Sequence, residues 1–128
     1  MSSGRIEIRG RGADRPMEFV QGPLLSPAAR EVRVRVRYAG VAYGDVMRRR
    51  GVLAPPFAFT PGYDVVGEVD AVGEGATLLR GQRVAVLMPL TGFGGYAEHV
   101  IVPATNCVPI PDAVHARDAI GLGLNAIT

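Results

Sequence analysis

Residues 60–75, TPGYDVVGEVDAVGEG, contain residue types that could form a ligand site. Four glycines and four acidic residues are spread among valines, so three interpretations compete: a phosphate-binding loop, a metal site, or β scaffold. The spacing of the valines predicts a buried strand, and Gly73–Gly75 predicts the turn that ends it. The candidate core residues of this segment are Val65, Val66, Val69 and Val72.

Three glycine-rich segments look like the phosphate-binding fingerprint of dinucleotide-binding folds. They cover residues 73–78, 92–97 and 121–126. The fingerprint needs a strand before it, a helix after it and an acidic residue about twenty positions further on. The first segment lies in a turn, the second leads into a strand, and the third follows a helical pattern. We therefore expect no dinucleotide-binding unit within these residues.

Few side chains are available for acid–base or nucleophilic chemistry. The sequence has two histidines, one cysteine and no lysine, which excludes Schiff-base chemistry and a lysine-dependent phosphate loop. His99 lies in a strand pattern and His115 at the start of a helix pattern, where neither position favours a general base. Cys107 has no histidine or arginine close to it in the sequence, so a small core residue is the favoured interpretation.

The basic residues are concentrated in one half of the chain. All fourteen are arginine, and eleven of them lie in residues 1–50 against five acidic residues, a bias that can indicate nucleic-acid binding. However, residues 31–38 alternate arginine with valine, which predicts a half-buried strand with a solvated arginine face. No aromatic residues interleave with the arginines as a base-stacking surface requires. We therefore expect no nucleic-acid partner.

Apolar and cysteine content give two further expectations. No apolar run approaches the length of a membrane span, so we expect no membrane partner. The single cysteine cannot form an internal disulfide, and it predicts a reducing, cytoplasmic compartment.

Hydrophobic periodicity predicts a mainly β domain with short helices. Short strands separated by Gly and Pro are typical of an all-β barrel or sandwich. In the first helix, Asp45 is expected as the N-cap and Gly51 at the C-cap. The expected strands cover residues 5–10, 15–23, 31–38, 63–73, 82–89, 95–103 and 107–111, and the expected helices cover 43–51 and 112–127.

The order of these features resembles the N-terminal GroES-like catalytic domain of the medium-chain dehydrogenase/reductase superfamily. The resemblance implies a partly open GroES-like β-barrel with short helices over residues 1–125. It also implies that residues 126–128 begin a hinge to an α/β Rossmann domain, which is absent from this chain. It rests on residues 39–51, 60–75, 81–104 and 108–128.

The same superfamily is divided into zinc-dependent and zinc-free branches. Zinc-dependent alcohol dehydrogenases have their ligands at the positions of Ala42, Tyr63 and Leu124. A methyl, a phenol and an isobutyl group cannot replace thiolate and imidazole at tetrahedral zinc. One cysteine also cannot form the four-cysteine structural zinc site of those enzymes. The expected metal content is therefore none.

The zinc-free branch is similar to this sequence in a motif that reads G-V-N-F-x-D-x-x-x-R-x-G-x-Y. The sequence departs from it at Ala42, where Asn is usual, and at Leu53, where a Tyr near the nicotinamide is common. The resemblance implies NADPH as cofactor, a quinone or enone as substrate, and hydride transfer without a metal. The motif positions that this sequence keeps are Gly40, Val41, Tyr43, Asp45, Arg49 and Gly51.

Five candidate site residues follow from the resemblance. Tyr43 and Tyr63 are the candidate catalytic donors to a developing oxyanion. The candidate cofactor-binding residues are Asp45, Arg49 and Thr128, the last because it matches a hinge threonine near the nicotinamide. Simpler interpretations stand beside these: Tyr43 as a packed aromatic with its hydroxyl in water, and Asp45 as a helix cap.

Two hypotheses therefore describe the whole chain. In the first, it is the N-terminal part of an NADPH-dependent quinone or α,β-unsaturated carbonyl reductase, inactive alone, binding NADPH weakly, and homodimeric as the full-length protein. In the second, it is a stand-alone GroES-like binding or assembly module without catalytic activity. An end within a hinge motif favours the first hypothesis.

Overall fold

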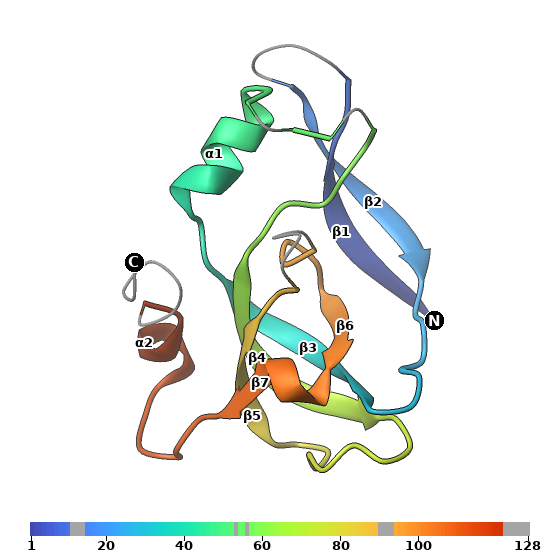
Figure 1. The fold of residues 1–128 in the computed structure, drawn as a ribbon, viewed down its shortest axis with the longest axis vertical. Coiled ribbons are helices and arrows are strands. Elements are labelled where there is room, and N and C mark those ends of the chain that lie inside the picture. The colour runs from blue at the N-terminus through green and yellow to red at the C-terminus, as the bar shows by residue number, and fades with distance from the viewer. Residues whose placement is uncertain (11–14, 53, 56, 90–93, 122–128) are drawn as a thin grey trace.

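The computed structural model describes residues 1–10, 15–52, 54–55, 57–89 and 94–121, and they form a mainly β structure (Figure 1). A two-stranded hairpin lies at one end, beside helix α1, and a five-stranded sheet forms the other end. The expected fold class is thereby confirmed. The elements are β1 (Ser2–Ile8), β2 (Met17–Pro23), β3 (Glu31–Ala39), α1 (Tyr43–Arg49), β4 (Asp64–Val72), β5 (Arg83–Leu87), β6 (His99–Pro103), the 3-10 helix η1 (Ala104–Asn106), β7 (Cys107–Pro109) and α2 (Ala116–Gly121).

The five-stranded sheet has the order β6-β3-β4-β5-β7, with every neighbouring pair antiparallel. The β3–β4 register shifts between Arg33 and Val34 and again between Val36 and Tyr38. Such irregularities bend a strand and increase its twist. The sheet curls around the core accordingly, but among the described residues its edge strands β6 and β7 do not pair with each other. It is an open sheet.

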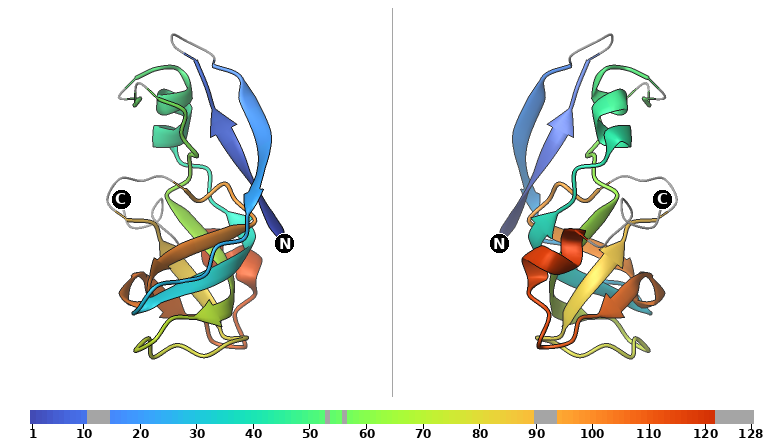
Figure 2. Two further views of the ribbon diagram at one scale, coloured as in Figure 1. Left: turned by 90° about the vertical axis from the view of Figure 1, so that its right-hand side faces the viewer. Right: turned by 90° about the vertical axis from the view of Figure 1, so that its left-hand side faces the viewer.

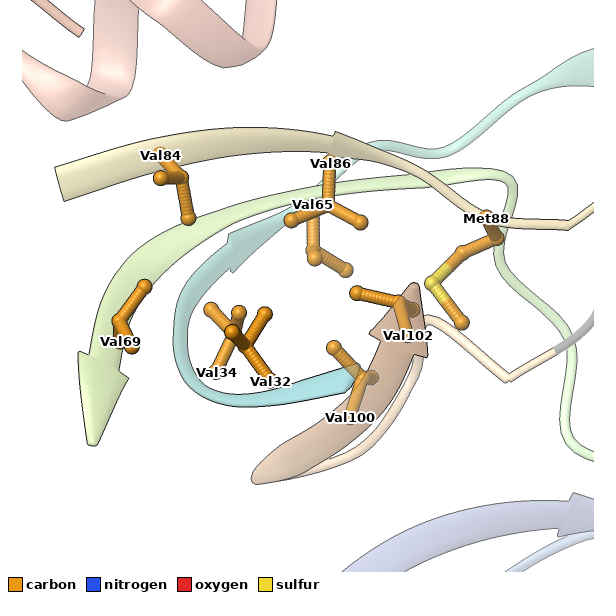
Figure 3. Packing of buried hydrophobic residues seen from close by; sticks show 9 residues of the cluster. All are labelled: Val32, Val34, Val65, Val69, Val84, Val86, Met88, Val100 and Val102. Carbon is orange, nitrogen blue, oxygen red and sulfur yellow. The ribbon is translucent and has the colours of Figure 1, made fainter. Parts of the chain in front are cut away.

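The concave side of this sheet holds a core made almost entirely of valine (Figure 3). Alternation along each strand sends these side chains inward, and burying one valine contributes roughly 1.5–3 kcal/mol. Val65, Val66 and Val69 are buried as the sequence predicted, and Val72 packs half-buried against the cluster. The cluster is formed by Val32, Val34, Val65, Val69, Val84, Val86, Met88, Val100 and Val102.

The outer face of β3 carries the alternating arginines. Arg33 pairs with Asp70 at 2.7 Å, and Arg35 and Arg37 reach Glu68 at 3.3 and 3.2 Å. The predicted solvated arginine face is confirmed for Arg35 and Arg37, which are about half exposed, whereas the Arg33 side chain is only 15% exposed. These arginines face acidic side chains of the neighbouring strand β4.

The segment before β6 takes a different path from the expected strand at 95–103. Its backbone bonds to the loop before β4: Gly94 N–H donates to Thr60 O at 2.8 Å, and Tyr96 N–H to Pro61 O at 2.9 Å. Because these donors are used by a loop, β6 begins only at His99. This contact brings residues 60–62, just before Tyr63, close to the segment that leads into β6.

The β1–β2 hairpin is attached across the same two loops. Ile6 N–H donates to Tyr96 O at 2.9 Å, and Ile8 N–H donates to Phe59 O at 2.8 Å. Figure 2 shows the hairpin and α1 standing together above the five-stranded sheet. The hairpin, α1 and the loop 57–62 therefore meet in one region, which contains the candidate site.

Helix α1 ends two residues earlier than expected, and α2 begins at Ala116 instead of at residue 112. The first expected helix, 43–51, corresponds to α1, and the second, 112–127, corresponds to α2 in its described part. Residues 122–128 lie outside the described residues.

Candidate functional site

Helix α1 begins immediately after Gly40–Val41 and presents the first candidate residues. Ala42 is the N-cap, with an extended backbone at φ −98° and ψ 156°. At the other end, Gly51 has φ 88° and its N–H donates to Arg48 O at 3.0 Å, a left-handed termination that favours glycine. The predicted N-cap was wrong, because Asp45 lies three residues after Ala42 and its carboxylate reaches back to it.

Asp45 is buried, and its carboxylate joins three segments. Oδ2 accepts from Ala42 N–H at 3.0 Å, and Oδ1 accepts from Gly62 N–H at 2.9 Å. The hydroxyl of Tyr96 donates to Oδ2 at 3.2 Å. The carboxylate thereby links the start of α1, the residue before Tyr63 and the loop before β6. This geometry suits the helix-capping interpretation, whereas the cofactor-binding role of Asp45 stays a prediction.

Tyr96 is a part of the site that sequence reasoning missed. Burial raises its pKa above the ordinary value, and the charge of Asp45, the hydrogen bond to Asp45 and the charge of Asp64 raise it further. Tyr96 therefore holds its proton on Asp45. The sequence read it as an ordinary strand residue, because nothing near it in the chain indicates a carboxylate 51 positions earlier.

Tyr63, the second candidate donor, is half-buried and contacts Arg48. The Arg48 Nη1–H donates a hydrogen bond to the Tyr63 hydroxyl oxygen. The guanidinium carbon also lies 4.7 Å from the centre of the Tyr63 ring, within the range of a cation–π contact. Arg48 is one of three consecutive arginines, and no feature of the sequence singles it out among them, so this contact was not expected.

Two glycines allow the close packing around Tyr63. A Cβ at Gly44 would overlap the Tyr63 hydroxyl and ring, so the helix can approach Tyr63 only without a side chain there. Gly62 has φ 115°, and a Cβ on it would lie 2.6 Å from the Cα of Gly95. The loop before Tyr63 therefore depends on glycine for both its backbone conformation and its close contact with the neighbouring loop.

Tyr43, the other candidate donor, lies on a different face of α1 from Gly44 and Arg48, about 100° and 140° around the helix by helical spacing. Its side chain is 72% exposed, and the nearby Val41 is 68% exposed. This exposure contradicts a packed aromatic ring and agrees only with a hydroxyl in water, while the catalytic role is not tested by exposure. The pair leaves an apolar surface open at the start of α1.

Arg49 lies beside a small hollow between α1 and the hairpin. Its Nε–H donates to Arg15 O at 3.2 Å. The hollow has a volume of about 240 Å³ and a mainly apolar wall. The arrangement places the cationic side chain of Arg49 against apolar neighbours, and its cofactor-binding role stays a prediction. The hollow is lined by Ile8, Met17, Val41, Asp45, Val46, Arg49, Pro61 and Tyr96.

Several sequence-based expectations fall outside the described residues. These are the candidate hinge residue Thr128, the departing motif position Leu53, and Leu124, which matches a metal-ligand position. The glycine segment 121–126 is outside as well, except for Gly121.

Two of the positions where zinc-dependent relatives have their ligands are described here, and their residues are not a zinc donor set. Ala42 offers a methyl group, and the Tyr63 hydroxyl is bonded to Arg48. In the part of the chain that the structure describes, no three residues of the types His, Cys, Asp and Glu are grouped closely enough to hold a metal ion. The chemistry of these side chains does not fit zinc, and zinc independence of the protein stays a prediction.

The remaining reactive residues lie away from α1. His99 Nδ1 is 2.9 Å from Ser3 Oγ, and its Nε2 is 3.5 Å from Asp70, so it joins the hairpin to the sheet. Burial raises the pKa of the Cys107 thiol to about 11, which agrees with an unreactive packed residue. His115 is exposed, and its Nδ1 accepts from Arg117 N–H at 3.0 Å.

Comparison with known proteins identifies the family. Residues 28–112 match the alcohol dehydrogenase GroES-like domain. The chain therefore belongs to the GroES-like domain family of alcohol dehydrogenases, and its relatives include members of the medium-chain dehydrogenase/reductase superfamily, as the sequence resemblance predicted.

Individual relatives give the level of similarity. The synaptic vesicle membrane protein VAT-1 homolog of Rattus norvegicus is 37% identical over 96% of this chain and 31% of its own length. A quinone oxidoreductase of Pseudomonas aeruginosa is 32% identical over 97% of this chain and 38% of its own length. A mycobacterial structure solved in complex with NADPH is 27% identical, covers 98% of this chain and 39% of that protein, and has a TM-score of 0.82.

These comparisons place the chain in an oxidoreductase-like family. The chain spans about a third of the length of the relatives it matches. Among the described residues, no helix is long and apolar enough to cross a membrane.

Proposed function

We propose that this chain is the substrate-side part of a zinc-independent, NADPH-dependent oxidoreductase that reduces quinones or α,β-unsaturated carbonyl compounds. The family match and the quinone oxidoreductase of Pseudomonas aeruginosa support the reaction class. The mycobacterial structure in complex with NADPH supports the cofactor. We assign residues 1–125 to the GroES-like catalytic domain and 126–128 to the start of a hinge, and the activity to the whole protein.

The observation that carries the proposal is the environment of Tyr63. At a position where the zinc-dependent branch has a metal ligand, this chain has a phenol bonded to the guanidinium of Arg48. Reduction of a quinone or an enone places negative charge on a carbonyl oxygen. A hydroxyl donor with a fixed cation beside it can stabilise that charge without a metal.

The fit of the described residues to NADPH is partial. When bound, NADPH supplies a hydride to an electron-poor carbon of the substrate. The exposed apolar side chains of Val41 and Tyr43 offer surface for a flat nicotinamide ring. Gly40 lies between β3 and α1, but residues 40–45 lack the glycine spacing of the dinucleotide fingerprint, so we assign the binding of the phosphates mainly to a nucleotide-binding domain outside these 128 residues.

The other site residues act by holding the donor in place. Asp45 fixes Gly62 and the start of α1, so Tyr63 and Tyr43 keep their relative positions during the reaction. Asp45 is itself buried beside the apolar hollow. In this account the chain orients the substrate oxygen and supplies a hydrogen bond, and orientation is the larger part of catalysis.

The experiment is a survey of NADPH oxidation by the whole protein, followed at 340 nm. The substrates are quinones and α,β-unsaturated ketones and aldehydes, with saturated ketones of matched size as the control. We expect oxidation with the conjugated substrates, little with the saturated ones, and the same rate after treatment with a zinc chelator. Activity lost on chelation, or confined to saturated ketones, would contradict the proposal.

A further inference from the structure

The hydrogen bond between Arg48 and Tyr63 has a direction that chemistry fixes. A guanidinium group has five N–H donors and no acceptor, so the Tyr63 oxygen must be the acceptor in this bond. The hydroxyl proton of Tyr63 is then not used by Arg48. Tyr96 is the opposite case, because its hydroxyl donates its proton to Asp45. Within one site, the Tyr96 hydroxyl proton is therefore engaged in a hydrogen bond to Asp45, whereas the Tyr63 hydroxyl proton is not engaged by Arg48.

Arg48 restrains the ring of Tyr63 as well as the hydroxyl. Its guanidinium carbon lies 4.7 Å from the ring centre, so one cation contacts the ring face and the oxygen of the same side chain. Contacts at both places limit rotation of the ring and of the hydroxyl. The positive charge also lies next to the oxygen that would gain negative charge when the Tyr63 proton is shared with a substrate.

The local sequence is arranged around this pair. Gly44 is one helical turn before Arg48, and its missing side chain provides the space that the Tyr63 ring and hydroxyl occupy. On the other side, Gly62 is held by the carboxylate of Asp45 at 2.9 Å. Tyr63 is therefore held in place by the anchored backbone of Gly62, by the surface of α1 at Gly44 and by the guanidinium of Arg48.

Arg48 differs in this respect from the arginine two positions later. Arg48 is half-buried against Tyr63, whereas Arg50 is exposed at the C-cap of α1. If the end of α1 were purely solvated, both arginines would be exposed. The structure separates them, so Arg50 is a matched control on the same helix.

From these observations we infer that Arg48 is a positioning residue for Tyr63, which directs the free hydroxyl proton of Tyr63 toward the carbonyl oxygen of the substrate. This inference rests on the proposed function. As the β-carbon of an enone accepts the hydride of NADPH, electron density moves to the carbonyl oxygen. That oxygen takes the Tyr63 proton and the substrate becomes an enol, while the tyrosinate is paired with the Arg48 guanidinium until water returns a proton.

The test is a double-mutant cycle in the whole protein, using Arg48→Met, Tyr63→Phe and the double variant. On general acid–base magnitudes we expect Tyr63→Phe to lower kcat about a hundredfold and Arg48→Met about tenfold or more, with KM within a factor of about three. The double variant should equal Tyr63→Phe within about twofold, because Arg48 acts through the hydroxyl. Arg48→Lys should recover part of the loss, and Arg50→Met should keep the unaltered kcat.

Independent losses that multiply in the double variant would overturn the inference, as would unaltered kcat in Arg48→Met. Wild-type protein inactive with every quinone and enone would instead overturn the proposed function. A readout without turnover is proton NMR of the Arg48 side chain, which the Tyr63 ring should shield, with the shielding lost in Tyr63→Leu. Absence of that shielding in the wild type also contradicts the inference. If Arg48→Met does not fold, the isosteric Tyr63→Phe and the Arg48→Lys variant carry the comparison.

Discussion

At the scale of single residues, two tyrosine hydroxyls of the site differ in their hydrogen-bonding roles. The Tyr96 hydroxyl donates a hydrogen bond to a buried carboxylate and keeps its proton, and the Tyr63 hydroxyl accepts a hydrogen bond from a guanidinium. The first arrangement stabilises the fold, because a buried donor and acceptor satisfy each other. The second leaves a proton available for a substrate. Two residues of one type therefore have different tasks, and their partners decide which.

Tyr96 should titrate apart from ordinary tyrosines. Its pKa is raised by burial and by Asp45, so the folded chain holds this proton above the ordinary tyrosine pKa of about 10. The contribution to folding stability is complete below pH about 10 and is lost as the pH rises further, because the unfolded chain deprotonates first. In a titration at 295 nm, we expect one tyrosine to ionise late in the folded protein. This late step should disappear in Tyr96→Phe and in urea; its persistence in Tyr96→Phe would contradict the assignment.

Cys107 should be slow to react. Burial raises the pKa of its thiol from 9.0 to about 11, which lowers the thiolate fraction at pH 8 about a hundredfold. We expect the folded chain to react with a disulfide reagent at least that much more slowly than free cysteine. Unfolding in urea should restore the ordinary rate. A folded-state rate equal to that of free cysteine would mean that the thiol is not packed.

At the scale of elements, the site depends on the junction between α1 and the loop 57–62. A seven-residue helix is too short to be stable alone, so it must be fixed by tertiary contacts. Asp45 provides them on one side and the close approach of Gly44 to Tyr63 on the other. Changes at either contact should affect stability before they affect chemistry.

Asp45→Ala should destabilise the fold by about 3 kcal/mol. The substitution leaves the N–H groups of Ala42 and Gly62 and the hydroxyl of Tyr96 without their shared acceptor in a buried region. Urea unfolding measures the change. The control is Asp112→Ala, an exposed carboxylate, for which we expect a change of at most about 0.5 kcal/mol. Equal effects of the two substitutions would refute the anchoring role of Asp45.

Gly44→Ala should reverse the usual effect of this substitution in a helix. In an open helical position, Gly→Ala stabilises by roughly 0.5–1 kcal/mol. At Gly44 the new methyl would overlap the Tyr63 hydroxyl and ring, so we expect destabilisation. Gly121→Ala in α2 is the control, because a Cβ there meets no atom of the described residues within 4 Å. Thermal unfolding compares the two, and stabilisation by Gly44→Ala would show that Tyr63 is not packed against α1.

How far the sequence predicts these elements depends on whether the information is local. The valine alternation in residues 31–38 and 63–73 predicted the central strands, because burial of every second residue depends only on the sequence of a single strand. The Asp45–Tyr96 bond was not predictable, since it joins residues 51 positions apart through two loops. The start of β6 was misplaced for the same reason, as a loop takes the backbone donors of residues 94–96.

The site residues stay predictions, but the contacts around them can be compared with the sequence. Motif resemblance selected Tyr63 and Asp45, and the structure brings Tyr63 against α1, which contains Asp45. It did not select Arg48, which looked like one member of a charged run of three arginines. Only the three-dimensional contact with Tyr63 distinguishes it from Arg50, and no periodicity or motif in the sequence carries that difference.

At the scale of the whole molecule, an open sheet and a hairpin provide a rigid support for one polar site. The valine core holds the five strands, and the hairpin closes over the loops that carry Tyr63 and Tyr96. The family match covers residues 28–112, which include α1, the loop 57–62 and Tyr96. The same fold serves different chemistries, so the side chains at the site, rather than the fold, must support the proposed reaction.

The most direct test of the account is deuterium transfer by the chelator-treated whole protein. NADPH carrying deuterium at C4 is incubated with an α,β-unsaturated ketone, and the product is analysed by mass spectrometry. The account predicts deuterium at the β-carbon of the saturated ketone, formed at the same rate with and without the chelator. Product without deuterium at that carbon, or no product once zinc has been removed, would contradict metal-free hydride transfer by this protein.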